Sequence, residues 1–354
     1  MGIEIVQAIA RIAYGKTERV TITTLENFYA AYKDRKSEAF IGQLDSADRR
    51  IAELLQRTQS KVVVFGSDFA QTVGLVMLRQ NVSFSLGVRV ATSKFSNVAL
   101  LSDITSTLQY PWPEPSERLL VASFIRSLAS FYGIDPDEDL VDQVMGAIGL
   151  ERGDRHSTVV EAMYRGLPET ERLKQLLAEL TDHEAETLVT VAMGYSAAAA
   201  TAGDIQLSWP GTTIEAMDKS TGPIQLLGRA RKVAEGPFYS LPSGRWIAGL
   251  IVKLEGNISG NQLLLKARVG NVAQAEINTG QVADGLFGFT LEFYVENTSS
   301  PVVLSLHTTE GAIEGQMTIE PIHLHRLESI FSDALAKDGN GEPANSRSHV
   351  RQAR

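Results

Sequence analysis

Two histidines stand two residues apart near the end of the chain and are the first candidates for chemistry. His323 and His325 fall on one face of a predicted strand, with Ile322 and Leu324 on the opposite face. Two imidazoles on one face could begin a metal site, to which His307 would add a third ligand if its strand is adjacent. We favour the alternative, a pair of solvated surface histidines, because no third ligand can be assigned. We therefore predict no metal ion.

An acidic run is the second candidate. Asp135-Pro136-Asp137-Glu138-Asp139 places carboxylates at alternate positions, as the start of a calcium-binding EF-hand loop does. Leu140 stands where that loop needs a glycine, and Gly146 stands where it needs the closing glutamate. The pattern instead predicts an acidic turn that caps a helix.

The third candidate is Gly66-Ser67-Asp68, which follows a short β-branched run. Such a turn can hold an anion at a helix N-terminus or present its serine as a nucleophile. Neither glycine-rich nucleotide-binding motif is present, and the turn lacks the G-x-S-x-G pattern of a nucleophile elbow. We predict no cofactor and an ordinary strand-to-helix turn. A transferase-type enzyme with its site near Ser67 and Asp68 stays open as an alternative.

Aromatic residues of the C-terminal third are the best candidates for binding a ligand. An aromatic ring beside polar side chains can hold a sugar ring by apolar stacking. We predict ligand binding by Trp209, Phe238, Tyr239 and Tyr294. The alternative for Tyr239 and Tyr294 is an ordinary surface or rim position. Trp246 lies on an apolar face and is expected in the core.

Composition limits the classes of protein. The chain has 354 residues, 44% of them hydrophobic, and a net charge of −9, which argues against nucleic acid as a partner because phosphate binding needs clustered cations. There is no cysteine, which excludes disulfides and cysteine nucleophiles and fits a reducing cytoplasm. We read no signal peptide and no membrane span. We therefore expect a cytoplasmic protein.

The elements that must position these residues divide the chain into parts. Residues 1–110 form a mixed α/β region, with helices predicted over 3–14, from Thr24, over 37–58 and over 69–80, and strands over 61–65 and 82–90. Three prolines between 111 and 115 mark a boundary, since proline cannot continue a helix. Residues 116–202 form a region of five predicted helices, the last of which ends in an alanine run.

Strands at short spacing replace helical periodicity from residue 205. Leu241-Pro242-Ser243-Gly244 has the composition of a β-turn, after which apolar residues alternate from Trp246 to Leu254. The pattern is repeated along 287–295, and seven or eight strands without a helix between them predict an antiparallel β-sandwich over 205–327. The fold class is therefore α+β and multidomain. The polar tail, 337–354, is predicted to be disordered.

A resemblance adds to this interpretation. The run from Gly236 to Trp246 resembles the strand entry of jelly-roll modules similar to carbohydrate-binding modules, including ones attached to bacterial polysaccharide-synthesis proteins. It covers at most residues 205–327, and no binding residue is transferred from it. From the sandwich pattern with its aromatic residues, and from the lack of a coherent catalytic set of residues, we predict a non-catalytic bacterial protein whose sandwich binds a glycan or a protein partner, in polysaccharide assembly. A transferase and a structural scaffold are the alternatives, and oligomeric state cannot be predicted.

Overall fold

The computed structural model describes residues 1–44, 49–104, 106–110, 119–164, 169–200, 204–219, 222–258, 260–329 and 349–352. Its contacts divide the chain into two compact units: unit 1 is Met1–Gln71 with Ile104–Glu179, and unit 2 is Thr72–Asp103 with Leu180–Arg354. Helix α4 (Phe69–Gln80) begins in unit 1 and ends in unit 2. The predicted boundaries follow the order of the chain, whereas these units are discontinuous, because residues 72–103 group with the C-terminal strands.

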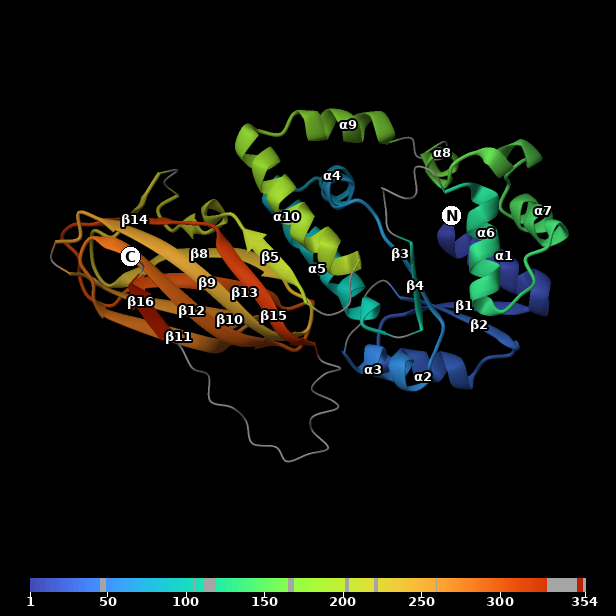
Figure 1. The fold of residues 1–354 in the computed structure, drawn as a ribbon, viewed down its shortest axis with the longest axis horizontal. Coiled ribbons are helices and arrows are strands. Elements are labelled where there is room, and N and C mark those ends of the chain that lie inside the picture. The colour runs from blue at the N-terminus through green and yellow to red at the C-terminus, as the bar shows by residue number, and fades with distance from the viewer. Residues whose placement is uncertain are drawn as a thin grey trace. The chain divides into compact units, whose positions relative to one another are not determined.

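Unit 1 combines helices with two pairs of parallel strands, β1 with β2 and β3 with β4 (Figure 1). The remaining elements of unit 1 are α1 (Gly2–Tyr14), β1 (Thr17–Ile22), α2 (Leu25–Lys33), β2 (Ala39–Leu44), α3 (Arg49–Arg57), β3 (Val62–Phe65), β4 (Thr107–Tyr110), α6 (Val121–Tyr132), α7 (Glu138–Ala147), the short 3-10 helix η2 (Arg152–His156), α8 (Val159–Tyr164) and α9 (Thr170–Ala178). Its core joins one face each of α1, α6 and α7, where Ile5, Ile9, Ile125 and Val144 are fully buried.

Three helices of unit 1 begin at residues whose side chains accept a backbone N–H of the first turn. Thr24 Oγ1 accepts from Asn27 at 3.1 Å, and Asp68 Oδ1 accepts from Gln71 at 2.7 Å. Asp137 Oδ1 accepts from Leu140 at 2.7 Å. Each bond satisfies a donor that the helix itself leaves unpaired. The predicted helix starts at Thr24 and Phe69 are confirmed, as is the capping role of the acidic turn.

The helix predicted over residues 37–58 is wrong. Residues 39–44 form β2, which pairs in parallel with β1 from Thr17↔Ala39 to Ile22↔Leu44, and only Arg49–Arg57 are helical. The apolar residues Phe40, Ile41 and Leu44 suit either element. Pairing with β1, which lies more than twenty residues earlier in the chain, decides between them because tertiary contacts override local propensity.

The strand predicted over residues 82–90 is also wrong, because these residues open helix α5 (Phe84–Ser102). Ser83 caps the helix through Leu86 N. Buried residues recur at helical spacing along it, at Val88, Ala91, Phe95 and Ala99. The alternation of apolar residues up to Val90 is therefore a coincidence of composition, and the helical period is visible only when the window extends to residue 102.

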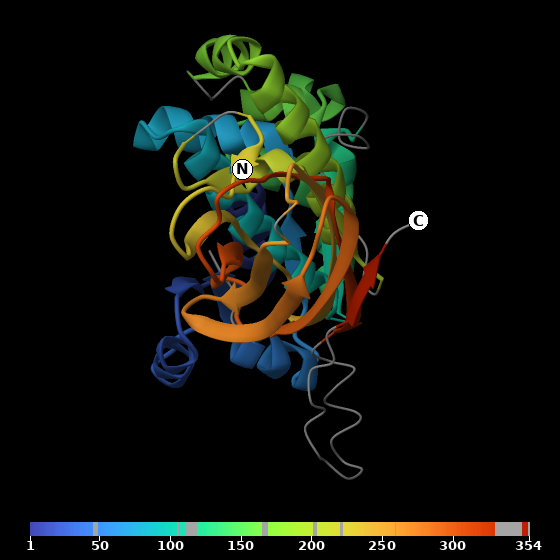
Figure 2. The ribbon, with the colours of Figure 1, turned by 90° about the vertical axis from the view of Figure 1, so that its left-hand side faces the viewer.

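Unit 2 is an antiparallel β-sandwich accompanied by α5, α10 (Asp182–Ala200) and most of α4, so the α+β class with a C-terminal sandwich is confirmed (Figure 1). One sheet has the order β11-β10-β13-β8-β6; the other has the order β16-β12-β9-β14-β7, with β15 pairing with β5 and β9. The elements are α5, α10 (Asp182–Ala200), β5 (Gln206–Trp209), the 3-10 helix η3 (Gly211–Thr213), β6 (Glu215–Ala216), β7 (Ile224–Gln225), β8 (Arg231–Ser240), β9 (Gly244–Glu255), β10 (Gln262–Val269), β11 (Val272–Gln281), β12 (Gly285–Val295), β13 (Pro301–Thr308), β14 (Gln316–Ile319), β15 (Ile322–Ser329) and β16 (His349–Gln352). Figure 2 shows the same strands, in yellow to red, turned by 90°.

Alternation within the strands builds the sandwich core. Along β9, every second residue from Trp246 to Leu254 is buried, and along β12 the buried set runs from Phe287 to Val295. The predicted β-turn, Leu241–Gly244, carries the chain from β8 in the five-stranded sheet to β9 in the other sheet. Trp246 is fully buried, as expected, and its Nε1 donates to Pro242 O at 2.8 Å. Within the described part of 205–329 there are eleven strands, β5 to β15; the excess over our prediction consists of strands of two to four residues.

Most of the tail that we predicted to be disordered lies outside the described residues. Within it, His349–Gln352 form β16, antiparallel to β12 from Phe287↔Gln352 to Thr290↔His349, so the prediction is wrong for these four residues. A strand at the edge of a sheet offers unpaired backbone groups, and these can pair with a segment of any composition. The proline boundary at 111–115 also lies outside the described residues.

Helices α5 and α10 are joined to the sandwich by buried polar contacts. Ser240 N donates to Thr92 Oγ1 at 3.2 Å, and Ser240 O accepts from Ser96 Oγ at 3.1 Å and from Tyr195 Oη at 2.6 Å. At the end of α5, the carboxylate of Asp103 meets the guanidinium of Arg326 on β15 in two parallel contacts of 3.0 and 3.2 Å. Both helices are therefore parts of the sandwich domain. Among the described residues, none of the helices has the length and apolar composition needed to cross a bilayer.

Candidate functional site

The four aromatic residues predicted to bind a ligand are not brought together. Trp209 and Tyr239 are 0% and 3% exposed and pack edge to face, with ring centroids 5.7 Å apart. Neither ring can present a face to a ligand, so an aromatic surface that includes them is wrong: β5 and β8 turn both side chains into the core. Burial also raises the pKa of Tyr239. The charge of Arg89 lowers this pKa and that of Glu215 raises it, each by a smaller amount than burial does.

Phe238 and Tyr294 are both half-buried, but they lie on different sheets. Phe238 is the extra residue of a β-bulge in β8, since Pro237 pairs with Val303 and Tyr239 with Val302. The guanidinium of Arg89, on α5, lies 4.5 Å from the centre of its ring. Tyr294 lies on β12, opposite Arg245 of β9. A role for either ring in binding stays a prediction.

A row of polar side chains crosses the five-stranded sheet on the face away from the sandwich core, with its central residue, Ser305, only 4% exposed. The register places Glu215 opposite Glu235, Glu235 opposite Ser305, Ser305 opposite Lys266 and Lys266 opposite Glu276. Directly opposed residues of antiparallel strands share a face. We call these five residues the polar row. Because neighbouring strands lie about 4.8 Å apart, the row is roughly 19 Å long.

Charges along the polar row are compensated in pairs. Lys266 Nζ lies 2.8 Å from Glu276 Oε2, and Glu235 Oε2 lies 2.5 Å from Lys232 Nζ and 3.8 Å from Arg268 Nη2. The paired side chains keep 20 to 54% of their surface exposed, so water or a ligand can reach them. The row therefore offers carboxylate acceptors and ammonium donors side by side.

His307 flanks the polar row on β13 and contacts its central residue. Its Nε2 lies 3.2 Å from Ser305 Oγ. Burial, with the ammonium groups of Lys266 and Lys232, lowers the pKa of His307, while Glu235 and Glu276 oppose the shift. A serine next to a histidine suggests a hydrolase, but an acyl-transfer site also needs free N–H donors for the oxyanion. β13 pairs with β10 on one side and β8 on the other, and this ladder uses the donors of the strand.

The sequence missed the polar row, although part of its signal was visible. Leu263, Leu265 and Ala267 mark the buried face of β10, which leaves Lys266 and Arg268 on the outward face. What the sequence lacks is register. Residues 215, 235, 266, 276 and 305 become neighbours only through pairings that span up to 70 positions of the chain.

The predicted pair of histidines lies on β15, with His323 exposed and Ile322 and Leu324 buried, as expected. His325 Nε2 lies 2.5 Å from Asp204 Oδ1. His307 is on the other sheet, so it cannot complete a metal site with them. Across the described residues, no three histidine or acidic side chains are grouped so as to hold a metal ion.

The turn at Gly66-Ser67-Asp68 connects β3 to α4, as predicted. Gly66 N donates to Tyr110 O of β4 at 3.1 Å. Asp68 caps α4, a role that accounts for its carboxylate without a substrate. The geometry is that of a strand-to-helix turn.

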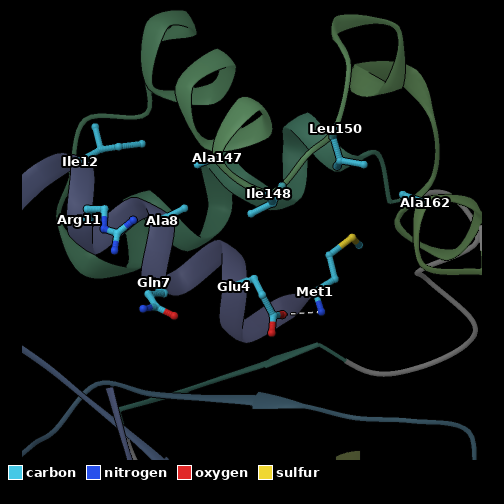
Figure 3. Close-up of a pocket in the computed structure, with 10 residues that line it drawn as sticks. All are labelled: Met1, Glu4, Gln7, Ala8, Arg11, Ile12, Ala147, Ile148, Leu150 and Ala162. Carbon is cyan, nitrogen blue, oxygen red and sulfur yellow. Dashed lines mark ion pairs between the residues drawn. The ribbon is translucent and has the colours of Figure 1, made fainter. Parts of the chain in front are cut away.

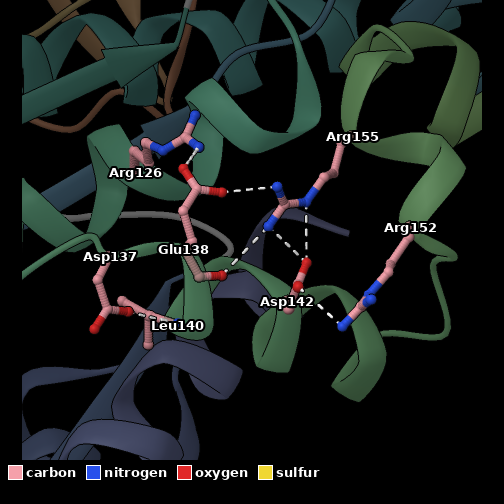
Figure 4. A network of polar contacts seen from close by, with 7 residues as sticks. All are labelled: Arg126, Asp137, Glu138, Leu140, Asp142, Arg152 and Arg155. Atoms are coloured by element: carbon pink, nitrogen blue, oxygen red, sulfur yellow. Dashed lines mark hydrogen bonds and ion pairs between the residues drawn. The ribbon is translucent and has the colours of Figure 1, made fainter.

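An ion-pair network lies beside the start of α7, where the sequence has its acidic run (Figure 4). Arg155 Nη1 lies 2.7 Å from Glu138 Oε2, and its Nη2 lies 2.7 Å from Asp142 Oδ1. Arg126 also contacts Glu138, and Arg152 Nη2 lies 3.5 Å from Asp142. Hydrogen bonds from Arg126 and Arg155 lower the pKa of Glu138. The network ties α6, α7 and η2 together and uses its charges internally, which is a structural role.

Comparisons with known proteins complete the description of the site. No protein-family model matches the sequence, and no curated protein matches it either. In structure, the chain is similar to the CBM36-1 domain of a multidomain xylanase from the hindgut metagenome of Trinervitermes trinervoides. The sequence identity is 13% and the TM-score is 0.22, and the match covers 34% of this chain and 96% of that chain. It is similar to the carbohydrate-binding module CsCBM6-3 from Clostridium stercorarium in complex with cellobiose, with 14% identity, 34% and 90% covered, and a TM-score of 0.19. A match to the Glycosylation Associate Protein (Gap123) complex from Streptococcus agalactiae covers 88% of this chain and 50% of that chain, at 10% identity and a TM-score of 0.25. The resemblance of the C-terminal third to carbohydrate-binding modules is thus found again in three dimensions, at scores too low to decide a function.

Proposed function

We propose that the protein is a non-catalytic binding protein whose β-sandwich binds a glycan along the polar row. One observation carries the proposal: the register aligns five polar side chains from five strands on one face, and four of them keep exposed surface while the central Ser305 is buried. Some of the sandwiches to which the chain is similar are carbohydrate-binding modules, one of them in complex with cellobiose. Those likenesses are slight, so the proposal depends on the row.

A glycan suits the row because its hydroxyl groups both donate and accept hydrogen bonds. The carboxylates of Glu235 and Glu276 accept, while the ammonium of Lys266 donates. The exposed fraction of these side chains lets a ligand replace water without opening the core. Phe238 is the aromatic residue that we propose for contact with a sugar. Tyr294 lies on the other sheet and serves as the control position for an aromatic ring away from the row.

The experiment uses a matched pair of double variants of the full chain on a glycan array, followed by calorimetric titration of any hit. Lys266→Ala/Glu276→Ala removes an ion pair of 2.8 Å from the row. Lys253→Ala/Glu255→Ala removes a pair of the same length from the other sheet. We expect the first variant to weaken glycan binding at least about tenfold, since each lost charged hydrogen bond costs about 1.5–3 kcal/mol. The second variant should bind as the unmodified protein does.

Two results would contradict the proposal. An array on which no glycan binds removes the glycan and leaves a protein partner as the ligand of the sandwich. Equal weakening by both double variants, neither of which changes the net charge, shows that the effect is not specific to the row. Phe238→Ala and Tyr294→Ala, measured on the same hit, decide which ring takes part.

The setting of this function is proposed from the sequence alone. A chain without cysteine suits a reducing compartment, and we propose the bacterial cytoplasm and a part in polysaccharide assembly. Fractionation of the producing cell tests the compartment, and recovery of the protein outside the cytoplasmic fraction would contradict it.

A further inference from the structure

Unit 1 contains a pocket that the proposed function does not use (Figure 3). It lies between α1, the end of α7 and α8, and its volume is about 700 Å³. Sites for small molecules usually measure about 300–1,000 Å³ and have mainly apolar walls with a few polar groups. The pocket meets both criteria.

The walls of the pocket are formed by the outer side of the unit 1 core. Ile12, Ile148 and Leu150 pack against that core and are only half-buried, and their side chains project into the space between the helices (Figure 3). Met1, Ala8, Ala147 and Ala162 complete the apolar lining. A linear alkyl chain placed here would cover apolar surface that water now contacts.

Polar residues of the pocket all come from one helix, α1. Glu4 carries the negative charge, and its carboxylate is compensated by the amine of Met1 at 2.5 Å and by Arg19 at 3.8 Å. Arg11 lies seven residues further along, about 10 Å away at the helical rise per residue. Its side chain is exposed, and no carboxylate of the described residues lies within ion-pair distance of it. The uncompensated charge at the pocket is therefore positive.

From this combination we propose that the pocket binds an alkyl carboxylate. The alkyl chain lies against Ile12, Ile148 and Leu150, and the carboxylate meets the guanidinium of Arg11. A guanidinium binds a carboxylate through two parallel hydrogen bonds, which gives both affinity and orientation. The site is in unit 1 and is independent of glycan binding by unit 2.

The test titrates the full chain with sodium decanoate by calorimetry, below the concentration at which decanoate forms micelles. Three variants accompany the unmodified protein. Arg11→Gln removes the charge and keeps a polar but shorter side chain. Ala147→Trp fills the pocket from an exposed position at the last turn of α7, so the core is not disturbed. Arg57→Gln, at an exposed position on α3, is the control for net charge.

We expect saturable binding of one decanoate per chain. Arg11→Gln should raise its Kd about tenfold or more, because a charge-assisted hydrogen bond is lost. Ala147→Trp should abolish binding, and Arg57→Gln should leave the Kd unchanged. Decanol should bind more weakly than decanoate and be insensitive to Arg11→Gln.

Three outcomes would overturn the proposal. The first is the absence of saturable binding to the unmodified protein. The second is equal weakening by Arg11→Gln and Arg57→Gln, which would assign the effect to overall charge. The third is unchanged binding by Ala147→Trp with its circular dichroism intact, which would place decanoate outside this pocket.

Discussion

The ion pair between Asp103 and Arg326 offers the sharpest test of how unit 2 is held together. The side chains are 5% and 1% exposed, and the two contacts of 3.0 and 3.2 Å are parallel. Asp103 ends α5, and Arg326 lies in β15. The change that we consider is Asp103→Asn, which keeps the size of the side chain and an acceptor oxygen but removes the charge.

The magnitude follows from the burial of the partner. Arginine cannot lose its proton in a protein, so Asp103→Asn removes the negative charge of this pair from beside a buried cation. Breaking a buried pair from one side costs about 3–5 kcal/mol, whereas replacing both partners with apolar residues of similar volume is often neutral or stabilising. We expect Asp103→Asn to cost about 3 kcal/mol or more and Asp103→Leu/Arg326→Met to cost clearly less than either single change.

Urea unfolding followed by tryptophan fluorescence measures these values, because Trp209 and Trp246 are buried in unit 2. The control is the exposed pair of Lys253 and Glu255, with 50 and 44% exposure, whose removal should cost less than about 1 kcal/mol. A loss below about 1 kcal/mol for Asp103→Asn would refute the reasoning. So would a double variant less stable than both single variants.

Three further predictions concern glycine, tyrosine and histidine. A Cβ at Gly211 would lie 1.8 Å from the backbone oxygen of Ile319, so Gly211→Ala should lower the free energy of unfolding by more than about 2 kcal/mol. Gly146 lies in an open position on α7, so Gly146→Ala should raise that free energy by about 0.5–1 kcal/mol. Thermal unfolding measures both, and equal effects of the two variants would contradict the packing. Burial raises the pKa of Tyr132 to about 12, so its contribution to stability is complete below the unfolded-state value of about 10 and is lost as the pH rises through 12. Ultraviolet titration of tyrosinate should accordingly show Tyr132→Phe missing a late step, and full ionisation near pH 10 in a folded chain would be inconsistent with this burial. Burial lowers the pKa of His307, so the contribution of this side chain to stability is present above about pH 6.5 and is lost as the pH falls. The melting temperature of His307→Gln should therefore fall less steeply on acidification than that of the unmodified protein. The same dependence of melting temperature on acid pH in both proteins would count against this prediction.

Local signals in the sequence predicted the parts of the fold that depend on local chemistry. Capping residues and helical periodicity located α1, α4, α7 and α10, and alternation located β9 and β12. Two segments were wrong for different reasons. The apolar residues of β2 suit a helix or a strand until β1 pairs with them, and those of α5 alternate by chance over one short window.

The candidate site was harder to predict than the fold because it depends on register. Trp209 and Tyr239 are aromatic and near a turn, yet they point inward, and nothing in their immediate neighbours distinguishes inside from outside. The polar row is assembled from five strands, and a shift of one residue in any pairing would turn that residue to the other face. Arg11 could be identified at the sequence level only as an exposed residue of an amphipathic helix, since its position at a pocket depends on α7.

The route of the chain through the two units has a consequence for synthesis. The chain passes from one unit to the other three times, after residues 71, 103 and 179, and α5 is made long before the strands that hold it. Thr92 is synthesised 148 residues before its hydrogen-bond partner Ser240, and the ribosome needs about 7 to 30 s to add those residues at ordinary rates of translation. During that interval the helix leaves the ribosome with its buried face uncovered. Unit 2 therefore cannot be completed until its last strands emerge, and a nascent chain stalled within unit 1 would expose α5 to chaperones and proteases.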